Sequence, residues 1–266
     1  MITSASNPQI KQLRLWQKKS AERVKDGIFL AESPKLVLEA PTSLIRSVYV
    51  SESFEKEAEP TSPRGLCREH LRREGISYEI LPDSLFETVS DEVTPQGVIA
   101  VLNRPQYDEE SLLSGPAPLL VLLENLQDPG NLGTILRTGE GAGITGVILS
   151  KGSVDPFHTK VVRATMGSIF RVPVLTGADF TELLPRLQAK GFATYAAHLR
   201  GTKYHTELSY TAPTAFVIGN EGNGLTSEVA DLCGSYLRIP MEGQVESLNA
   251  AISAALLMYE AHRQRH

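Results

Sequence analysis

The chain has 266 residues, of which 41% are hydrophobic and 21% charged, and its formal net charge is −5. These proportions are those of an ordinary globular protein, and they exclude disorder, collagen-like repeats and coiled coil. The length is enough for two domains or one large one. No apolar run reaches the about 20 residues that a membrane helix requires, so no membrane partner is expected.

The N-terminal segment, residues 1–12, lacks a basic segment followed by an apolar run, which argues against a signal peptide. With only two cysteines in the whole chain, this predicts residence in the cytoplasm. Between residues 9 and 25 a single acid, Glu22, accompanies six basic side chains and Trp16; the six are Lys11, Arg14, Lys18, Lys19, Arg23 and Lys25. This composition fits either a local basic patch or a first helix with solvated charged faces.

Short β-type runs then alternate with helix-type runs from Phe29 to Asn103, which predicts a small α/β layer. Residues 104–118 combine prolines with a charge run and small polar residues, a composition typical of linkers. The expected division is therefore a first domain over residues 1–104, a linker over 105–118 and a second domain over 119–266.

The second domain opens with a five-residue apolar run, Leu119–Leu123, which reads as a buried parallel strand. Alternating helix-type and strand-type runs follow to the end of the chain. The pattern predicts an open, mostly parallel sheet with helices on both faces. In the last helix, Leu248, Ile252, Leu256 and Tyr259 keep roughly one face, and further apolar residues widen it, which fits burial on two sides or burial within one monomer.

Two glycine-rich motifs of nucleotide-binding proteins fail on context. Residues 141–146 match the dinucleotide fingerprint, but they close a helix and lead into a strand, so a helix C-cap is the better interpretation. Residues 219–224 have the spacing of a phosphate-binding loop, yet Leu225 and Thr226 stand where lysine and serine or threonine belong. Neither an NTPase nor a nicotinamide-dependent dehydrogenase is favoured, and no metal site is expected because no metal-ligand spacing occurs.

Polar residues gather in three segments that each follow a predicted strand: 124–137, 218–222 and 239–249. Because the carboxyl ends of parallel strands share one edge of a sheet, these segments could converge although about 120 residues separate them.

These segments resemble the SpoU/TrmH family of RNA ribose 2′-O-methyltransferases, part of the SPOUT superfamily. The family's three motifs occur in order: Asn-Leu-Gly-x-x-x-Arg from Asn131 to Arg137, Gly-Asn-Glu-Gly from Gly219 to Gly222, and Ile-Pro-Met through Ser-Leu-Asn from Ile239 to Asn249. The first domain is similar to the family's small substrate-binding module, with Glu32-Ser33 where the family often has Glu-Gly.

The resemblance implies a deep trefoil knot, a homodimer with the C-terminal helix near its interface, and S-adenosylmethionine as the methyl donor. RNA is the implied partner, with ribosomal RNA favoured and transfer RNA the nearer alternative; a catalytically silent RNA-binding or ribosome-assembly protein is the alternative from another class. Matching the motifs assigns Asn131, Arg137, Glu221, Ser247 and Asn249 to the active site. It assigns Gly219, Ile239, Met241 and Leu248 to the cofactor pocket.

The chemistry of these side chains suggests their roles. The planar, permanently charged guanidinium of Arg137 suits a phosphate clamp, and it cannot serve as the base because it gives up no proton near neutral pH. A nearby phosphate oxygen or Glu221 would then receive the proton of the ribose hydroxyl. Asn131 follows Pro129-Gly130 at the start of a helix, so it is also expected to cap that helix.

Overall fold

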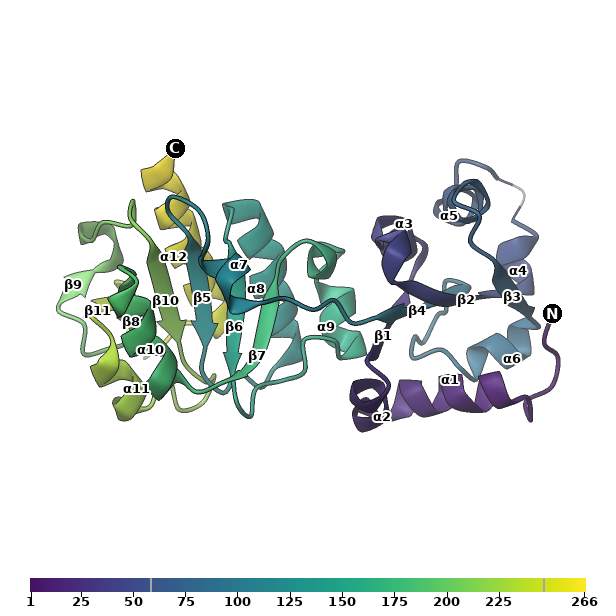
Figure 1. Ribbon diagram of the computed structural model, residues 1–266, viewed down its shortest axis with the longest axis horizontal. Coiled ribbons are helices and arrows are strands. Elements are labelled where there is room, and N and C mark those ends of the chain that lie inside the picture. Colours follow the sequence, from purple (N-terminus) through teal and green to yellow (C-terminus); the bar gives the residue numbers. More distant parts are fainter. Residues whose placement is uncertain (58, 246) are drawn as a thin grey trace. The chain divides into compact units, whose positions relative to one another are not determined.

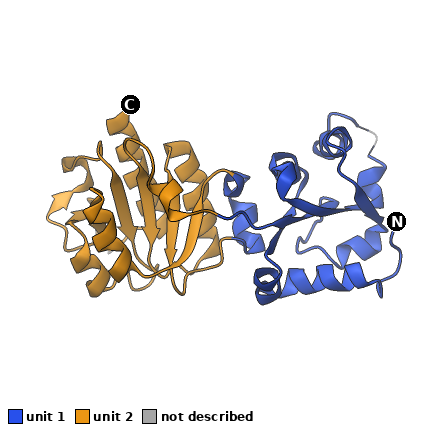
Figure 2. Cartoon of the chain, viewed as in Figure 1, with its two compact units in different colours: residues 1–106, 157–170 blue, residues 107–156, 171–266 orange. Residues whose placement is uncertain are grey.

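Two β-sheets organise the computed structural model, which describes residues 1–57, 59–245 and 247–266 (Figure 1). The chain divides into two compact units, residues 1–106 with 157–170 and residues 107–156 with 171–266 (Figure 2). None of the helices in the described ranges combines the length and apolar content that a membrane span requires.

The first unit contains a four-stranded sheet in the order β1-β4-β2-β3, in which only β2 and β3 run parallel. Its strands are β1 (Ile28–Glu32), β2 (Ile45–Ser51), β3 (Tyr78–Leu81) and β4 (Val98–Asn103). Its helices are α1 (Pro8–Lys18), α2 (Ser20–Lys25), α3 (Pro34–Glu39), α4 (Glu52–Glu55), α5 (Pro63–Arg73), α6 (Asp83–Glu87) and α9 (Thr159–Ala164). The predicted small α/β layer is therefore present.

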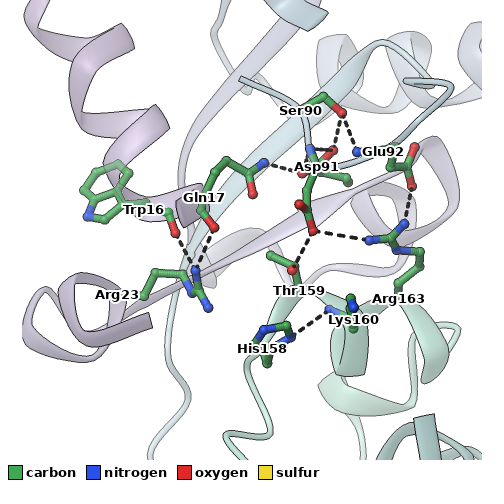
Figure 3. Close-up of polar contacts among 11 residues, drawn as sticks. Trp16, Gln17, Arg23, Ser90, Asp91, Glu92, His158, Thr159, Lys160 and Arg163 are labelled. Carbon is green, nitrogen blue, oxygen red and sulfur yellow. Dashed lines mark hydrogen bonds and ion pairs between the residues drawn. The ribbon is translucent and has the colours of Figure 1, made fainter. Parts of the chain in front are cut away.

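Residues 157–170 join this unit although they follow the second unit's first strands in sequence. The centre of the Phe157 ring lies 4.9 Å from that of Phe29 in β1, and the Arg104 guanidinium lies 4.8 Å from the centre of the Phe157 ring. The Thr159 hydroxyl donates a hydrogen bond to Asp91, and Arg163 pairs with the same carboxylate (Figure 3). Aromatic packing and ion pairing thus hold a segment that the strand and helix pattern alone assigned to the second domain.

The second unit contains a seven-stranded sheet in the order β7-β6-β5-β10-β8-β11-β9, in which every pairing is parallel. Its strands are β5 (Leu119–Leu123), β6 (Gly146–Ser150), β7 (Val174–Ala178), β8 (Ala193–Ala197), β9 (Lys203–Tyr204), β10 (Thr214–Ile218) and β11 (Ser235–Arg238). Its helices are α7 (Glu109–Leu113), α8 (Pro129–Ala142), α10 (Phe180–Ala189), α11 (Ser227–Leu232) and α12 (Ala250–Arg265). The expected open parallel sheet is confirmed, whereas the knot stays a prediction from the resemblance.

Helices cover both faces of this sheet. Alternate residues of β5 and β10, among them Leu120 and Val217, pack against α7, α10 and α11. Helices α8 and α12 pack side by side along the sheet (Figure 1). Helix α7 lies within the expected linker because Leu112 is buried in this core, and Gly143 ends α8 in the left-handed conformation, which confirms the predicted C-cap.

Ser33 adopts a backbone conformation that favours glycine, with φ at 145° and ψ at 149°. Its hydroxyl accepts a hydrogen bond from the backbone N–H of Leu36 and so caps α3. Ser33 therefore combines backbone strain with the N-cap of α3. The family that this chain resembles often has glycine at this position.

We expect Ser33→Gly to raise the free energy of unfolding by about 1 kcal/mol, because relief of strain exceeds the loss of the cap and the entropy that glycine adds to the unfolded chain. Ser33→Ala keeps the strain and removes the cap, so it should lower stability by about 1 kcal/mol. Urea unfolding of both variants measures the difference; a glycine variant less stable than the alanine variant would contradict this account.

Candidate active site

The register of the parallel sheet brings two of the three polar segments together. Leu123, the last residue of β5, lies beside Ile218, the last residue of β10. The pairing continues one residue further, because the backbone N–H of Glu124 donates to the Ile218 carbonyl at 2.9 Å. The segments that follow the two strands therefore leave the same edge of the sheet side by side, as expected for a parallel sheet.

The carboxylate of Glu221 connects these two segments. It accepts hydrogen bonds from the backbone N–H groups of Gln127 at 3.1 Å and Asp128 at 2.9 Å. It also accepts from the side-chain amide of Asn131 at 2.9 Å. One ionised group thus satisfies three donors from the start of α8.

Asn131 extends this network to the third segment. Its side-chain oxygen accepts a hydrogen bond from the side-chain amide of Asn249 at 2.9 Å. The expected cap role of Asn131 is wrong, because Asp128 caps α8 by accepting from the Asn131 backbone N–H at 2.7 Å. The Asn131 side chain is consequently free to join Glu221 to Asn249, and Asn249 itself caps α12.

The pKa of the Glu221 carboxyl group is lowered from its usual value of 4.5. Partial desolvation acts in the opposite direction, but the hydrogen bonds from Asn131, Asp128 and Gln127 to the ionised form outweigh it. Glu221 is therefore ionised at neutral pH and a weaker base than an ordinary glutamate.

The loop over residues 219–224 is closed by its own backbone. Asn220 and Gly224 exchange hydrogen bonds of 3.1 and 2.9 Å, and a Cβ on Gly219 would lie 2.0 Å from the carbonyl carbon of Gly224. Only glycine permits this approach. The buried carboxylate of Glu124 holds the far end of the loop by accepting from the backbone and hydroxyl of Thr226.

A cavity of about 290 Å³ lies between this loop and the segment after β11. All four residues expected to bind the cofactor line it: Gly219, Ile239, Met241 and Leu248. Glu221 and Ser247 from the expected catalytic set line it as well. The size is near the lower end of the about 300 to 1,000 Å³ that is usual for small-molecule sites.

The cavity suits S-adenosylmethionine in the chemistry of its walls. Aliphatic and thioether side chains offer apolar surface for a purine ring, and the glycine-rich loop exposes backbone groups for its polar edge. The buried Nε of Arg238, a lining residue, has no hydrogen-bond partner among the described residues. Such an unsatisfied donor fits a ligand that carries hydrogen-bond acceptors.

Asn131, Asn249 and Arg137 are not among the residues that line the cavity. The two asparagines reach it through Glu221, whereas Arg137 is exposed on α8 and makes no hydrogen bond or ion pair with any residue in the described ranges. Six residues turn a helix by about 600°, so Arg137 lies about 120° around α8 from Asn131.

His198, Leu199 and Arg238 line the cavity but were absent from the sequence prediction. They follow β8 or end β11, so the rule that ligands bind at the carboxyl ends of parallel strands could have found them. Burial, together with the neighbouring Arg200, lowers the pKa of His198, which is therefore neutral at pH 7.

Residues 118–259 match the model of the SpoU rRNA Methylase family, and residues 7–100 match the MRM3-like substrate binding domain. The chain is 33% identical over 260 residues to the 23S rRNA (guanosine(2553)-2′-O)-methyltransferase RlmP of Bacillus subtilis, with 97% of each chain covered. These matches extend over both compact units.

Solved structures give the same picture. The AdoMet-bound rRNA methyltransferase from Sinorhizobium meliloti superposes with a TM-score of 0.84 at 30% identity, covering 98% of this chain and 97% of the other. The SpoU methyltransferase AviRb from Streptomyces viridochromogenes, in complex with AdoMet, gives 0.83 at 26% identity, covering 97% and 98%.

Glu221→Gln should reduce stability at pH 7 by about 1 kcal/mol, because a neutral amide accepts the three hydrogen bonds less strongly and solvent screens part of the loss. Since the pKa of Glu221 is lowered in the folded state, its contribution is present above the usual value of 4.5 and declines as pH falls below it. Urea unfolding at pH 7 and pH 4 should therefore show a smaller difference between wild type and variant at pH 4. An equal difference at both pH values would contradict the ionised junction.

Proposed function

The chain belongs to the SpoU rRNA methylase family, and from this premise we propose how its residues carry out the reaction. It is an S-adenosylmethionine-dependent enzyme that methylates a ribose 2′-hydroxyl of RNA. The Bacillus relative, which is named for 23S ribosomal RNA, supports ribosomal rather than transfer RNA as the substrate. The observation that carries the proposal is that Glu221, Asn131 and Asn249 join three distant motif segments at one cavity.

The cofactor pocket proposed here is the cavity beside the 219–224 loop. Bound S-adenosylmethionine supplies an electrophilic methyl group on its sulfonium sulfur. Ile239, Met241 and Leu248 would enclose its adenine ring, while the backbone at Gly219 reads the polar edge of the base. Glycine at position 219 keeps that backbone in place because the loop closes directly against it.

The remaining polar residues would bind the ribose and the phosphate of the RNA. Ser247 and Asn249 would orient the ribose, with Asn249 held by Asn131. The ionised Glu221, which already accepts three hydrogen bonds, fits an organising role better than that of proton acceptor. A phosphate oxygen of the RNA, positioned by Arg137, then receives the proton of the hydroxyl.

The first unit would hold the RNA, in line with its match to a substrate-binding domain. The assignment of residues 1–104 to RNA binding and 119–266 to catalysis is part of this proposal. Cytoplasmic residence also stays a prediction.

Helix α12 supports the proposed homodimer. Its alanine-rich face is buried, whereas Ile252, Leu256 and Tyr259 are exposed by 50%, 40% and 49%. Their spacing of four and three residues forms one exposed apolar stripe. The sequence allowed this apolar surface to be buried either within one monomer or between two. In the single chain the stripe is exposed, and a second copy would cover it.

Arg137 lies one helical turn before Gly141, and Gly141 is next to this stripe. Thr134, Arg137 and Gly141 share the exposed face of α8, and a Cβ on Gly141 would lie 3.1 Å from the Tyr259 hydroxyl. A partner seated on the stripe would therefore approach Arg137. We propose that Arg137 clamps RNA at the cavity of the partner subunit rather than at its own.

Arg137→Ala should bind S-adenosylmethionine as the wild type does but lose at least about 100-fold in methyl transfer, because the phosphate clamp is removed. Arg137→Lys keeps the charge without the bidentate geometry, so its activity should fall between the two. Calorimetry and transfer of tritiated methyl to ribosomal RNA are the measurements; transfer at the wild-type rate by the alanine variant would exclude the role.

Mixing two inactive variants tests which cavity Arg137 serves. Met241→Arg should block the cavity and leave Arg137 intact, whereas Arg137→Ala leaves the cavity intact. After subunit exchange, half of the dimers are mixed and each has one complete site, so activity should return to about a quarter of the wild-type value. If Arg137 serves its own subunit, the mixture stays inactive.

A further inference from the structure

Helix α1 presents a stripe of basic side chains to solvent. Lys11, Arg14 and Lys18 are spaced three and four residues apart, so they lie within about 60° of one another around the helix. The opposite side of α1 packs into the core of the first unit through Ile10 and Leu13. The stripe is therefore a consequence of the fold and extends for about 10 Å along the helix.

No carboxylate among the described residues pairs with the charges of this stripe. Lys11 and Lys18 are exposed and make no hydrogen bond or ion pair with any residue that the structure describes. Within the part of the chain that the structure describes, Arg14 donates to the neutral hydroxyl of Thr88 and pairs with no carboxylate. The nearby acid Asp26 is occupied elsewhere, because its carboxylate accepts from Gln12 at 3.2 Å and from the Trp16 indole at 2.7 Å.

Two other residues of the basic N-terminal segment have structural roles instead. Arg23 is buried, and its guanidinium donates to the backbone carbonyls of Trp16 and Gln17 (Figure 3). Trp16 is only 7% exposed, so its ring does not offer a platform on which an RNA base could stack. The exposed residues of this segment can therefore offer RNA positive charge but not a stacking surface.

We propose that Lys11, Arg14 and Lys18 bind the phosphate backbone of the substrate RNA. The inference rests on the proposed function and assigns it a contact surface. The whole chain has a net charge of −5, which repels RNA. The positive stripe is a local exception to this negative charge. Because the stripe offers charge without an aromatic ring, it contributes affinity and position rather than choice of sequence.

The same unit provides matched controls. Lys35 pairs with Glu39 at 3.8 Å and Lys56 with Glu52 at 2.9 Å, and each lysine is four residues from its partner in sequence. These lysines are exposed, as those of the stripe are, but an acid neutralises each one. Their removal changes the net charge of the protein by the same amount.

The test compares Lys11→Gln/Lys18→Gln with Lys35→Gln/Lys56→Gln in the full-length protein. The probe is deproteinised 23S ribosomal RNA of Bacillus subtilis, titrated at several salt concentrations. The stripe variant should bind about tenfold more weakly at low salt, and the slope of log affinity against log salt should fall by about 2. The control variant should show neither change, and thermal unfolding should be similar for both.

Equal salt slopes in the two variants would overturn the proposal. So would a stripe variant that keeps its RNA affinity and loses binding to phosphatidylglycerol vesicles, since the surface would then serve a membrane. Methyl transfer by the control variant should stay near the wild-type rate. Absence of transfer by the wild type would instead defeat the proposed function, and the binding comparison would still decide the role of the stripe.

Discussion

One ionised carboxylate joins the polar segments at the carboxyl edge of the seven-stranded sheet. Glu221 lies in a loop after β10, yet its three donors come from the turn that begins α8 after β5. Backbone N–H groups in the first turn of a helix lack partners within the helix, so a carboxylate that reaches them is stabilised in its charged form. The contact fixes two loops to each other and orients the Asn131 amide toward the third.

The sheet makes this contact possible, because its backbone register places the ends of β5 and β10 beside each other. Glu124 and Gly219 then shape the loops in different ways. Glu124 holds Thr226 through a buried carboxylate, and the absence of a side chain at Gly219 lets the loop close on itself. The walls of the cavity are thus set by backbone geometry and buried hydrogen bonds, which leaves the lining side chains free to contact a ligand.

The sequence is sufficient to predict the parallel sheet and the C-cap at Gly143, and it groups four residues that line one cavity: Gly219, Ile239, Met241 and Leu248. Periodicity gives strands, and strand ends indicate a site, but neither shows which side chain makes which hydrogen bond. The pattern therefore predicts Asn131 as the N-cap of α8, whereas Asp128 has this role. Side-chain packing between distant segments was equally hidden, so the pattern did not show that residues 157–170 join the first unit through Phe157.

Helix α12 illustrates a further limit, because the amino-acid pattern does not say which apolar face is covered inside one chain. On α12, Ala254, Leu257 and Met258 are buried, whereas Ile252, Leu256 and Tyr259 remain exposed. The basic N-terminal segment shows the same ambiguity for charge, since Arg23 turned inward and Lys18 outward. Both outcomes follow from packing rather than composition.

A crystal structure of the protein with S-adenosylmethionine tests the central claim most directly. The account predicts density for the cofactor inside the cavity that the 219–224 loop forms with Ile239, Met241 and Leu248, with the hydrogen bonds among Glu221, Asn131 and Asn249 intact. Density at another site, or a Glu221 side chain released from the start of α8 when the cofactor is bound, would contradict it.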